Sequence, residues 1–389
     1  MRHPKLLPAI LLICSSMTVM AGSIITPALP DIGRFFHSEP DWMVKLILTL
    51  PALVIALVAP FIGSLADRFG RRRLLLLSLV IYALGGVAGA LVNDIHLMLA
   101  TRAVLGLGVA GIMSLITTLI GDYYQGDARR KLMGLQGTFM ALGGVVYLNM
   151  GGVLADISWR GPFLVYLLAL VILPFAIWLI REPNRQQSAE EAALPVTPLP
   201  FWPVAGVYGL GFFSMMSFYI MPVQFPFLVM EKTGLNTVWI GFAISVATFT
   251  AALVGLFYGR MRSRPDYTVV QSIAFAGMGA GYVVMYLADS YAVLLLGCAL
   301  GGLGGGLMMP NLNMWLMELA PAAMRGRIMG GYASVFFMGQ FTSPLVAAPV
   351  ITLWSLNGVF MVWALGLFAM AALLIIKAAL GRPSVQTSV

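Results

Sequence analysis

Charged side chains are scarce in this chain, and one short stretch gathers several of them. Only 10% of the 389 residues are charged, yet GSLADRFGRRR at 63–73 holds one aspartate and four arginines. A carboxylate among guanidinium groups suits an ion pair or the positive N-terminal end of a helix. Simple anchoring at a membrane edge would explain Arg72 and Arg73, but it leaves Asp67 without a purpose.

Two other charges lie within or beside apolar stretches. Arg102 lies well inside one of these stretches. It either extends its long side chain to nearby water or faces a cavity, where it would meet an anionic substrate or Asp31. Asp31 is either a hydrated residue at a helix end or a protonatable partner of Arg102. Because no acid stands in the middle of an apolar stretch, Asp31 is the best carrier if protons are the coupling ion.

Methionine is abundant, with 25 residues, and polar or aromatic side chains are scattered among the apolar stretches. Flexible, polarizable methionines suit a site for varied apolar ligands, although packing alone explains most of them. The pattern favours an amphiphilic ligand over a small ion. The residues expected to contact a small-molecule substrate are Arg102, Asp31, Tyr147, Asn149, Met113, Tyr219, Gln224, Asn311 and Trp315, and Met140, Met215, Met309 and Gln340 belong to the same pattern.

Several classes of function lack the residues that they need. The two cysteines lie in apolar stretches and the three histidines are far apart, so we expect no disulfide, no metal site and no cofactor. No nucleophile–base pair marks an enzyme, and we expect no catalytic residue. Residues 106–111 match Gly-x-Gly-x-x-Gly, but they follow no strand and form no nucleotide loop. The basic residues lie in loops, which argues against nucleic-acid binding.

The elements that must position these residues are membrane-spanning helices. The chain is 60% hydrophobic, which no soluble core of this size would bury. The apolar runs are continuous rather than alternating, so helices are expected rather than a barrel. The predicted spans are 6–28, 43–64, 74–92, 96–121, 132–155, 160–181, 202–229, 236–257, 268–287, 291–316, 328–351 and 355–377.

The loop charges predict the orientation of these spans. Eighteen of the 23 lysines and arginines fall on the side that holds both termini, four on the other side, and Arg102 within a span. Both termini are therefore expected in the cytoplasm, with the protein in the inner (cytoplasmic) membrane. The chain divides into a six-helix bundle at 1–181, a cytoplasmic linker at 182–201 and a second six-helix bundle at 202–389, and we expect it to act as a monomer.

A constant offset of 196 residues relates the two halves. It places Gly106, Asp122 and Gly134 on residues 302, 318 and 330, which are again glycine, an acid and glycine. Six spans in each half make the repeat parallel, as in two bundles related by an axis along the membrane normal. Such bundles can rock about a central site.

These features together resemble the major facilitator superfamily along the whole chain, and most closely its twelve-span, drug-exporter-like branch. GSLADRFGRRR matches the family's loop signature between spans two and three, LATRAVLGLG at 99–108 resembles the motif of span four, and TPALPDIGRFF at 26–36 resembles the end of span one. Two of the family's motifs are altered in this chain. Leu105 replaces a glutamine, and Tyr147-Leu148 replaces the Gly-Pro that antiporters usually carry, which weakens an antiport reading.

The resemblance supports a role for the charged loop as a conformational latch. It would hold the bundles together while the central site faces outward, with Asp67 near the helix that starts at about Arg327. Asp122 would pair with Arg68 or Arg71. The residues assigned to the latch are Gly63, Asp67, Arg68, Gly70, Arg71 and Asp122. In the second half Asp67 corresponds to Ser263, so the latch would be asymmetric.

The function expected from the sequence is secondary active transport. The chain would export small amphiphilic, drug-like compounds by alternating access, with protons as the candidate coupling ion. The alternative is a transporter of a specific metabolite or siderophore-type compound, by uptake or export, without drug antiport.

Overall fold

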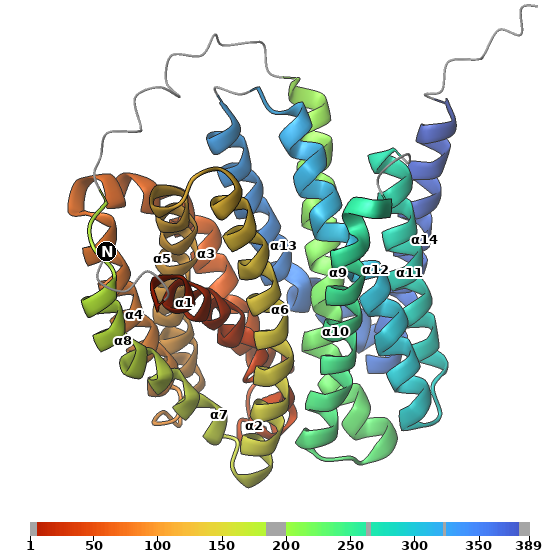
Figure 1. Ribbon diagram of the computed structural model, residues 1–389. Helices are drawn as coiled ribbons and strands as arrows, with labels where there is room; N and C mark the ends of the chain where they lie inside the picture. The colour runs from red at the N-terminus through yellow and green to blue at the C-terminus, as the bar shows by residue number, and fades with distance from the viewer. Residues whose placement is uncertain (1–5, 184–199, 262–265, 322–323, 381–389) are drawn as a thin grey trace, which may run out of the picture.

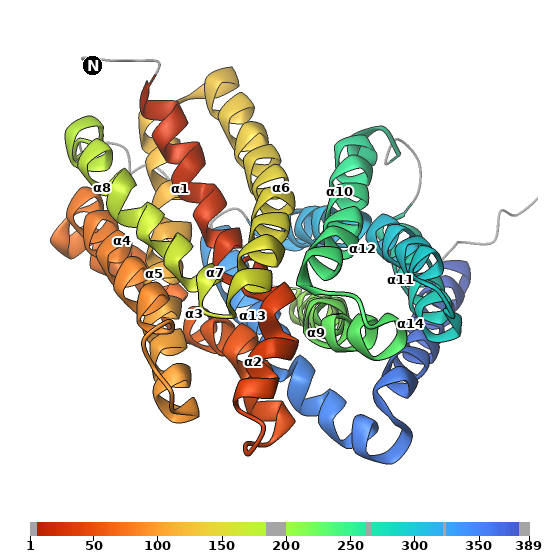
Figure 2. The same ribbon diagram turned by 90° about the horizontal axis from the view of Figure 1, so that it is seen from below.

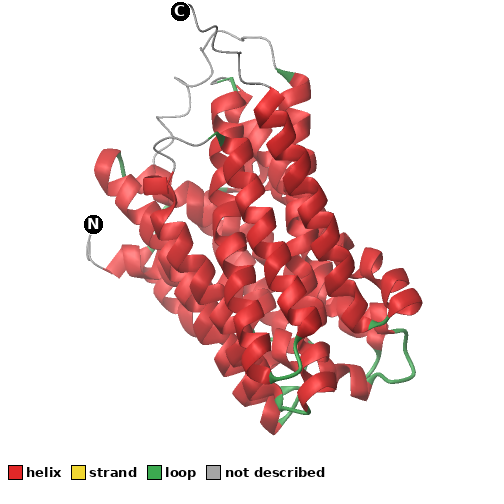
Figure 3. Ribbon diagram, turned by 90° about the vertical axis from the view of Figure 1, so that its right-hand side faces the viewer, coloured by secondary structure: helices red, strands yellow, loops and turns green. Residues whose placement is uncertain are grey.

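A computed structural model describes residues 6–183, 200–261, 266–321 and 324–380, and within these ranges the chain is helical, without strands (Figure 3). The fold class expected from the sequence, an all-α membrane protein, is confirmed. The helices are α1 (Leu6–Ser23), η1 (Thr26–Ala28), α2 (Leu29–Phe35), α3 (Asp41–Phe69), α4 (Arg71–Ala88), α5 (Ile95–Tyr123), α6 (Gly126–Ile157), α7 (Gly161–Leu164), η2 (Val165–Leu167), α8 (Leu168–Leu179), α9 (Phe201–Thr233), α10 (Thr237–Met261), α11 (Tyr267–Leu287), α12 (Tyr291–Leu319), α13 (Arg325–Trp354) and α14 (Leu356–Leu380).

Each of the predicted spans corresponds to a helix or to consecutive helical segments. By length and apolar composition, 11 helical units of the described chain qualify as spans. The remaining span is α4, whose first three residues are Arg71, Arg72 and Arg73. The helix begins three residues before the predicted span, and its apolar part is shorter than predicted because it ends at Ala88 rather than at 92.

The first span changes helix type near its end. Pro27 and Pro30 each occupy one of the first positions of a new segment, η1 and α2 respectively. Proline is tolerated there because the first N–H groups of a helix have no partner within the helix. After α1 the span therefore continues as two short segments to Phe35, seven residues beyond its predicted end at 28.

The buried side chains form separate clusters in the two halves of the chain. One large cluster draws its buried members from residues between Leu7 and Ile180. Two others draw theirs almost entirely from residues between Val204 and Leu374. Figure 2 shows α4, α5 and α8 on one side of the molecule and α11 and α14 on the other.

The helix order gives the molecule two distinct ends. The junctions α3–α4 and α5–α6 and the start of α9 lie at one end, which we call the arginine-rich end (upper part of Figure 1). The junctions α4–α5, α6–α7 and α9–α10 lie at the other, which we call the opposite end.

Candidate functional site

The two halves of the molecule are joined toward the opposite end, where α6 packs on α10. The Asn149 amide donates to the Ser245 hydroxyl (2.7 Å), and the Thr237 hydroxyl donates to the carbonyl oxygen of Gly152 (2.8 Å). A Cβ at Gly152 would lie 2.7 Å from the Thr237 carbonyl oxygen, so glycine permits this close approach. These contacts lie in the half of α6 nearer the opposite end.

A second seal at this end joins the first bundle to α9. Leu29, Leu48 and Val223 form a small buried cluster, with Phe227 packed against it. The Lys45 ammonium, from α3, lies 5.1 Å from the centroid of the Phe227 ring. This cation–π contact places a charge that is 4% exposed across the seal.

Toward the arginine-rich end α6 separates from α10. A Cβ built at Gly134 or Gly137 of α6, or at Gly330 of α13, would meet nothing within 4 Å. Figure 2 shows α6 and α10 diverging from the end at which they touch. Helices α6 and α10 thus touch at the opposite end and are apart at the arginine-rich end.

A central cavity of about 380 Å³ lies between the two halves. Helices α1, α3, α5 and α6 line it from one side and helices α9 to α13 from the other. Six methionines line it, and none of the described residues that line it is Asp, Glu, Lys or Arg. Its methionines and its aromatic and polar side chains include Met113, Met140, Met215, Met221, Met278, Met309, Phe218, Tyr219, Phe336, Phe337, Thr248 and Gln340.

Two of the nine predicted substrate residues, Met113 and Tyr219, line this cavity. Tyr219 reaches across the interface, since a Cβ at Gly22 of α1 would lie 3.7 Å from its hydroxyl. The hydroxyl of Tyr147 instead bonds with that of Ser16 (2.9 Å), joining α6 to α1. Asn149 belongs to the α6–α10 seal described above.

Arg102 does not have either of its predicted environments. Its side chain is fully buried and away from the cavity lining, and it donates to the carbonyl oxygens of Gly85 and Gly86 at 2.8 Å each. Those carbonyls belong to the last turn of α4, where oxygens lack partners within the helix and a cation is favoured. The guanidinium also lies 4.9 Å and 5.6 Å from the ring centroids of Phe163 and Tyr166.

The predicted partnership of Arg102 with Asp31 is likewise wrong for this conformation. Asp31 pairs with Arg34 in α2, at 3.0 Å. Residues at i and i+3 on a helix face each other, which makes this local pair the easier one to form. Asp31 is therefore a helix-end residue rather than part of the cavity.

Three further predicted substrate residues lie outside the cavity lining. The amide of Asn311 donates to the carbonyl of Tyr267 (2.9 Å) and to the side-chain oxygen of Gln271 (3.1 Å), and Trp315 stacks on the Tyr267 ring. This network joins α11 to α12 inside the second half. Gln224 of α9 is fully buried, and its amide forms no hydrogen bond with the described residues.

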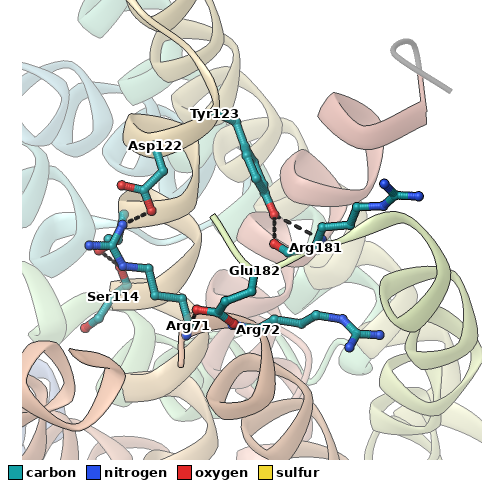
Figure 4. A network of polar contacts seen from close by, with 8 residues as sticks. Arg71, Arg72, Ser114, Asp122, Tyr123, Arg181 and Glu182 are labelled. Carbon is teal, nitrogen blue, oxygen red and sulfur yellow. Dashed lines mark hydrogen bonds and ion pairs between the residues drawn. The ribbon is translucent and has the colours of Figure 1, made fainter. Parts of the chain in front are cut away.

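At the arginine-rich end, the charged loop is tied into the first half of the molecule (Figure 4). Arg71 pairs with Asp122 of α5. The Glu182 carboxylate accepts the backbone N–H groups of Arg71 (2.7 Å) and Arg72 (3.0 Å), so it caps the start of α4. Sequence reasoning missed Glu182, and its only signal was an acid directly after the sixth span.

The backbone conformation at position 70 explains why this loop requires glycine there. Its φ of +89° is a conformation that other residues rarely adopt, and a Cβ there would lie 3.0 Å from a carboxylate oxygen of Glu182. The Tyr123 hydroxyl adds a second link, donating to the carbonyl of Arg181 and accepting from its N–H (3.1 Å). Loop, α5 and the residues after α8 therefore form one network.

The latch between bundles stays a prediction. Asp67 lies near the end of α3 and has an interaction of its own, while the Arg68 guanidinium lies 5.4 Å from the centroid of the Phe69 ring. Gly63 has open space around it. The counterpart position Ser263 lies outside the described residues. Within the described ranges, no three histidine, cysteine or acidic side chains gather as metal ligands would.

The family model described as Major Facilitator Superfamily matches residues 11–270 and 207–388. The chain belongs to this superfamily. The bacillibactin exporter of Bacillus subtilis (strain 168) is 25% identical over 86% of this chain and 87% of its own length. The class C tetracycline resistance protein of Escherichia coli is 26% identical over 88% of this chain and 89% of its own. The protein is therefore a membrane transporter with efflux proteins among its relatives.

The same fold occurs in the crystal structure of a bacterial homolog to the human lysosomal transporter Spinster. The two align with a TM-score of 0.76 over 97% of this chain and 96% of that chain, at 16% identity. At this identity the likeness concerns the fold alone.

Proposed function

We propose that this member of the superfamily exports small amphiphilic organic compounds by alternating access, driven by an ion gradient. The observation that carries the proposal is the central cavity, which both halves line, beside helices α6 and α10 that touch at the opposite end and diverge toward the arginine-rich end. A site shared by two bundles changes its access when the bundles rock against each other.

The chemistry of the cavity walls supports an amphiphilic substrate. Apolar and aromatic walls bind apolar surface, and flexible methionines adapt to different shapes. The side chains of Tyr219, Thr248 and Gln340 offer hydrogen bonds to a few polar groups of the substrate. Walls without ionised side chains offer no partner to a strongly charged compound. Moving such a compound from water into the cavity would cost on the order of several kcal/mol.

The distribution of basic residues supports an orientation. The arginine-rich end carries most loop lysines and arginines, so we assign it, with both termini, to the cytoplasm, and the protein to the cytoplasmic membrane. The cavity then opens to the cytoplasm, where an exporter loads its substrate. We treat the monomer as the transporting unit, with the bilayer and one small-molecule substrate as its partners.

A second candidate is the export of one specific metabolite or siderophore-type compound. The bacillibactin exporter, which aligns along most of both chains, favours it. Tyr147 and Leu148 also occupy the place where antiporters of the family usually have Gly-Pro. Both hypotheses use the same cavity and differ in how many compounds it accepts.

The test measures accumulation of a panel of lipophilic compounds in cells with and without the protein. Expression should lower accumulation of several compounds, and a protonophore should restore it. Tyr219→Leu and Gln340→Leu should change the order of preference among compounds, whereas Tyr147→Phe, outside the cavity, should not. Unchanged accumulation across the panel would overturn broad export and favour the specific-compound alternative, and efflux indifferent to the protonophore would remove proton coupling.

A further inference from the structure

A second hollow, of about 760 Å³, lies at the arginine-rich end, away from the central cavity. It is formed by the start of α4, the end of α8 and the residues that follow α8. Its charged lining residues are Arg68, Arg72, Arg73, Arg181 and Glu182. Four positive charges against one negative charge make it the kind of site that an anion would occupy.

The single carboxylate of this hollow is already engaged. Glu182 accepts the N–H groups of Arg71 and Arg72, so its charge serves the start of α4. Arg72 donates through Nη2 to the carbonyl oxygen of Ile177 (2.8 Å), which fixes its side chain across the gap between α4 and α8. The Nε of Arg72 is buried and has no hydrogen-bond partner among the described residues. A guanidinium N–H donor thus remains unsatisfied beside the hollow.

The rim of the hollow is apolar on the side of the membrane. Phe69, Ile177 and Trp178 line it, and their exposed fractions are 55%, 47% and 57%. Trp178 stands where transmembrane helices carry tryptophan, at the boundary between hydrocarbon and headgroups. Below it, Leu77 of α4 and Val171 of α8 are 54% and 60% exposed. The ligand that fits therefore has an anionic head and a long apolar body.

We propose that this hollow binds the headgroup of an anionic phospholipid, whose acyl chains lie along the outer surfaces of α4 and α8. The arginines hold the phosphate, and the rim of Phe69, Ile177 and Trp178 packs on the glycerol and upper chains. A free phosphate would use the arginines but not the rim. The bound lipid would bridge α4 and the residues after α8, the same segments that Glu182 joins.

The proposal is tested with full-length protein in detergent, by titrating phosphatidylglycerol and phosphatidylcholine with identical acyl chains and measuring bound lipid by native mass spectrometry. We expect clear preference for phosphatidylglycerol. Each arginine near an anionic lipid contributes about fivefold in affinity, so R68Q/R73Q should bind about 25-fold more weakly. Both side chains are exposed, and unchanged binding of phosphatidylcholine shows that the variant is folded.

The matched control is R129Q/R130Q, which removes two exposed arginines from the same end of the molecule without touching the hollow. It should retain the preference for phosphatidylglycerol. Trp178→Ala should weaken lipid binding while leaving the charges in place. Equal binding of both lipids, an equal loss in the control, or full competition by inorganic phosphate or glycerol phosphate would overturn the proposal. None of these readouts depends on transport or on the central cavity.

Discussion

Substituting Gly70 by alanine tests how the charged loop is built. Gly70 has a φ of +89°, and a Cβ there would lie 3.0 Å from one carboxylate oxygen of Glu182 and 3.1 Å from its Cδ. A non-glycine residue held in this region costs about 1–3 kcal/mol. Displacing the Glu182 carboxylate from the N–H groups of Arg71 and Arg72 adds about 0.5–2 kcal/mol, the usual value of a helix N-cap. We therefore expect Gly70→Ala to destabilise the protein by about 2–4 kcal/mol, the middle of the summed range.

Gly63, in the same loop motif, is the matched control. It lies inside α3, and a Cβ there would meet nothing within 4 Å. Alanine favours a helix over glycine by up to about 1 kcal/mol, so Gly63→Ala should be neutral or stabilising. The assay is the unfolding midpoint of each purified variant in one detergent at one scan rate, together with denaturant unfolding where it is reversible.

The contribution of Glu182 is separated by a double-mutant cycle. In a Glu182→Ala background the alanine at 70 meets no carboxylate, so only the backbone cost of about 1–3 kcal/mol remains. Wild-type stability of Gly70→Ala would refute the reasoning from the backbone. If Gly70→Ala lowered the stability equally with and without the Glu182 side chain, the clash between the new Cβ and the Glu182 carboxylate would be refuted.

Three further predictions address transport and the buried charges. Asp67→Asn should reduce transport while the protein still inserts in the membrane, and full transport would end the latch hypothesis. Arg102→Lys should destabilise the protein by about 1.5–3 kcal/mol, because a lysine cannot keep both carbonyl bonds and the ring contacts. Asp31→Asn should change the stability by less than about 0.5 kcal/mol. Thermal unfolding checks both variants, and a double variant whose loss of stability departs strongly from the sum of the two single losses would contradict the structure. Gly152→Val should keep the opposite end open, which external thiol labelling of a single cysteine placed in the cavity would detect, while Gly137→Val should leave labelling as in the parent protein.

The spans were predictable because a bilayer imposes a strong and simple constraint. About 20 apolar residues are needed to cross it, and every backbone group must be satisfied within the segment. The ends of spans were less accurate, as at α4, whose arginines join the helix at the membrane edge. Charge scarcity narrowed the expected partner of Asp122 to Arg68 or Arg71, and the structure pairs it with Arg71.

The cavity residues were harder to predict because these helices are apolar on all sides. A soluble helix shows its buried face by polar residues on the other face, but a membrane helix has no such contrast. Asn311 and Met309 are neighbours in α12, yet Asn311 bonds within the second half while Met309 lines the cavity. Helix rotation decides between these roles, and the sequence of one chain carries little information about it. Arg102 was misplaced for a related reason, because the carbonyls that hold it belong to a different helix.

Glycines show how one residue type serves both ends of the molecule. At the opposite end Gly152 and Gly241 touch backbone of the facing half, and a Cβ at Gly241 would lie 2.5 Å from the Leu148 carbonyl oxygen. At the arginine-rich end Gly134 and Gly330 have empty space where a Cβ would be. Gly134 and Gly330 correspond to each other under the 196-residue repeat, so they occupy equivalent places in the two halves. If the bundles alternate as proposed, this equivalent pair is where close helix contacts form when the arginine-rich end closes, and the contacts at Gly152 and Gly241 are those that must then open.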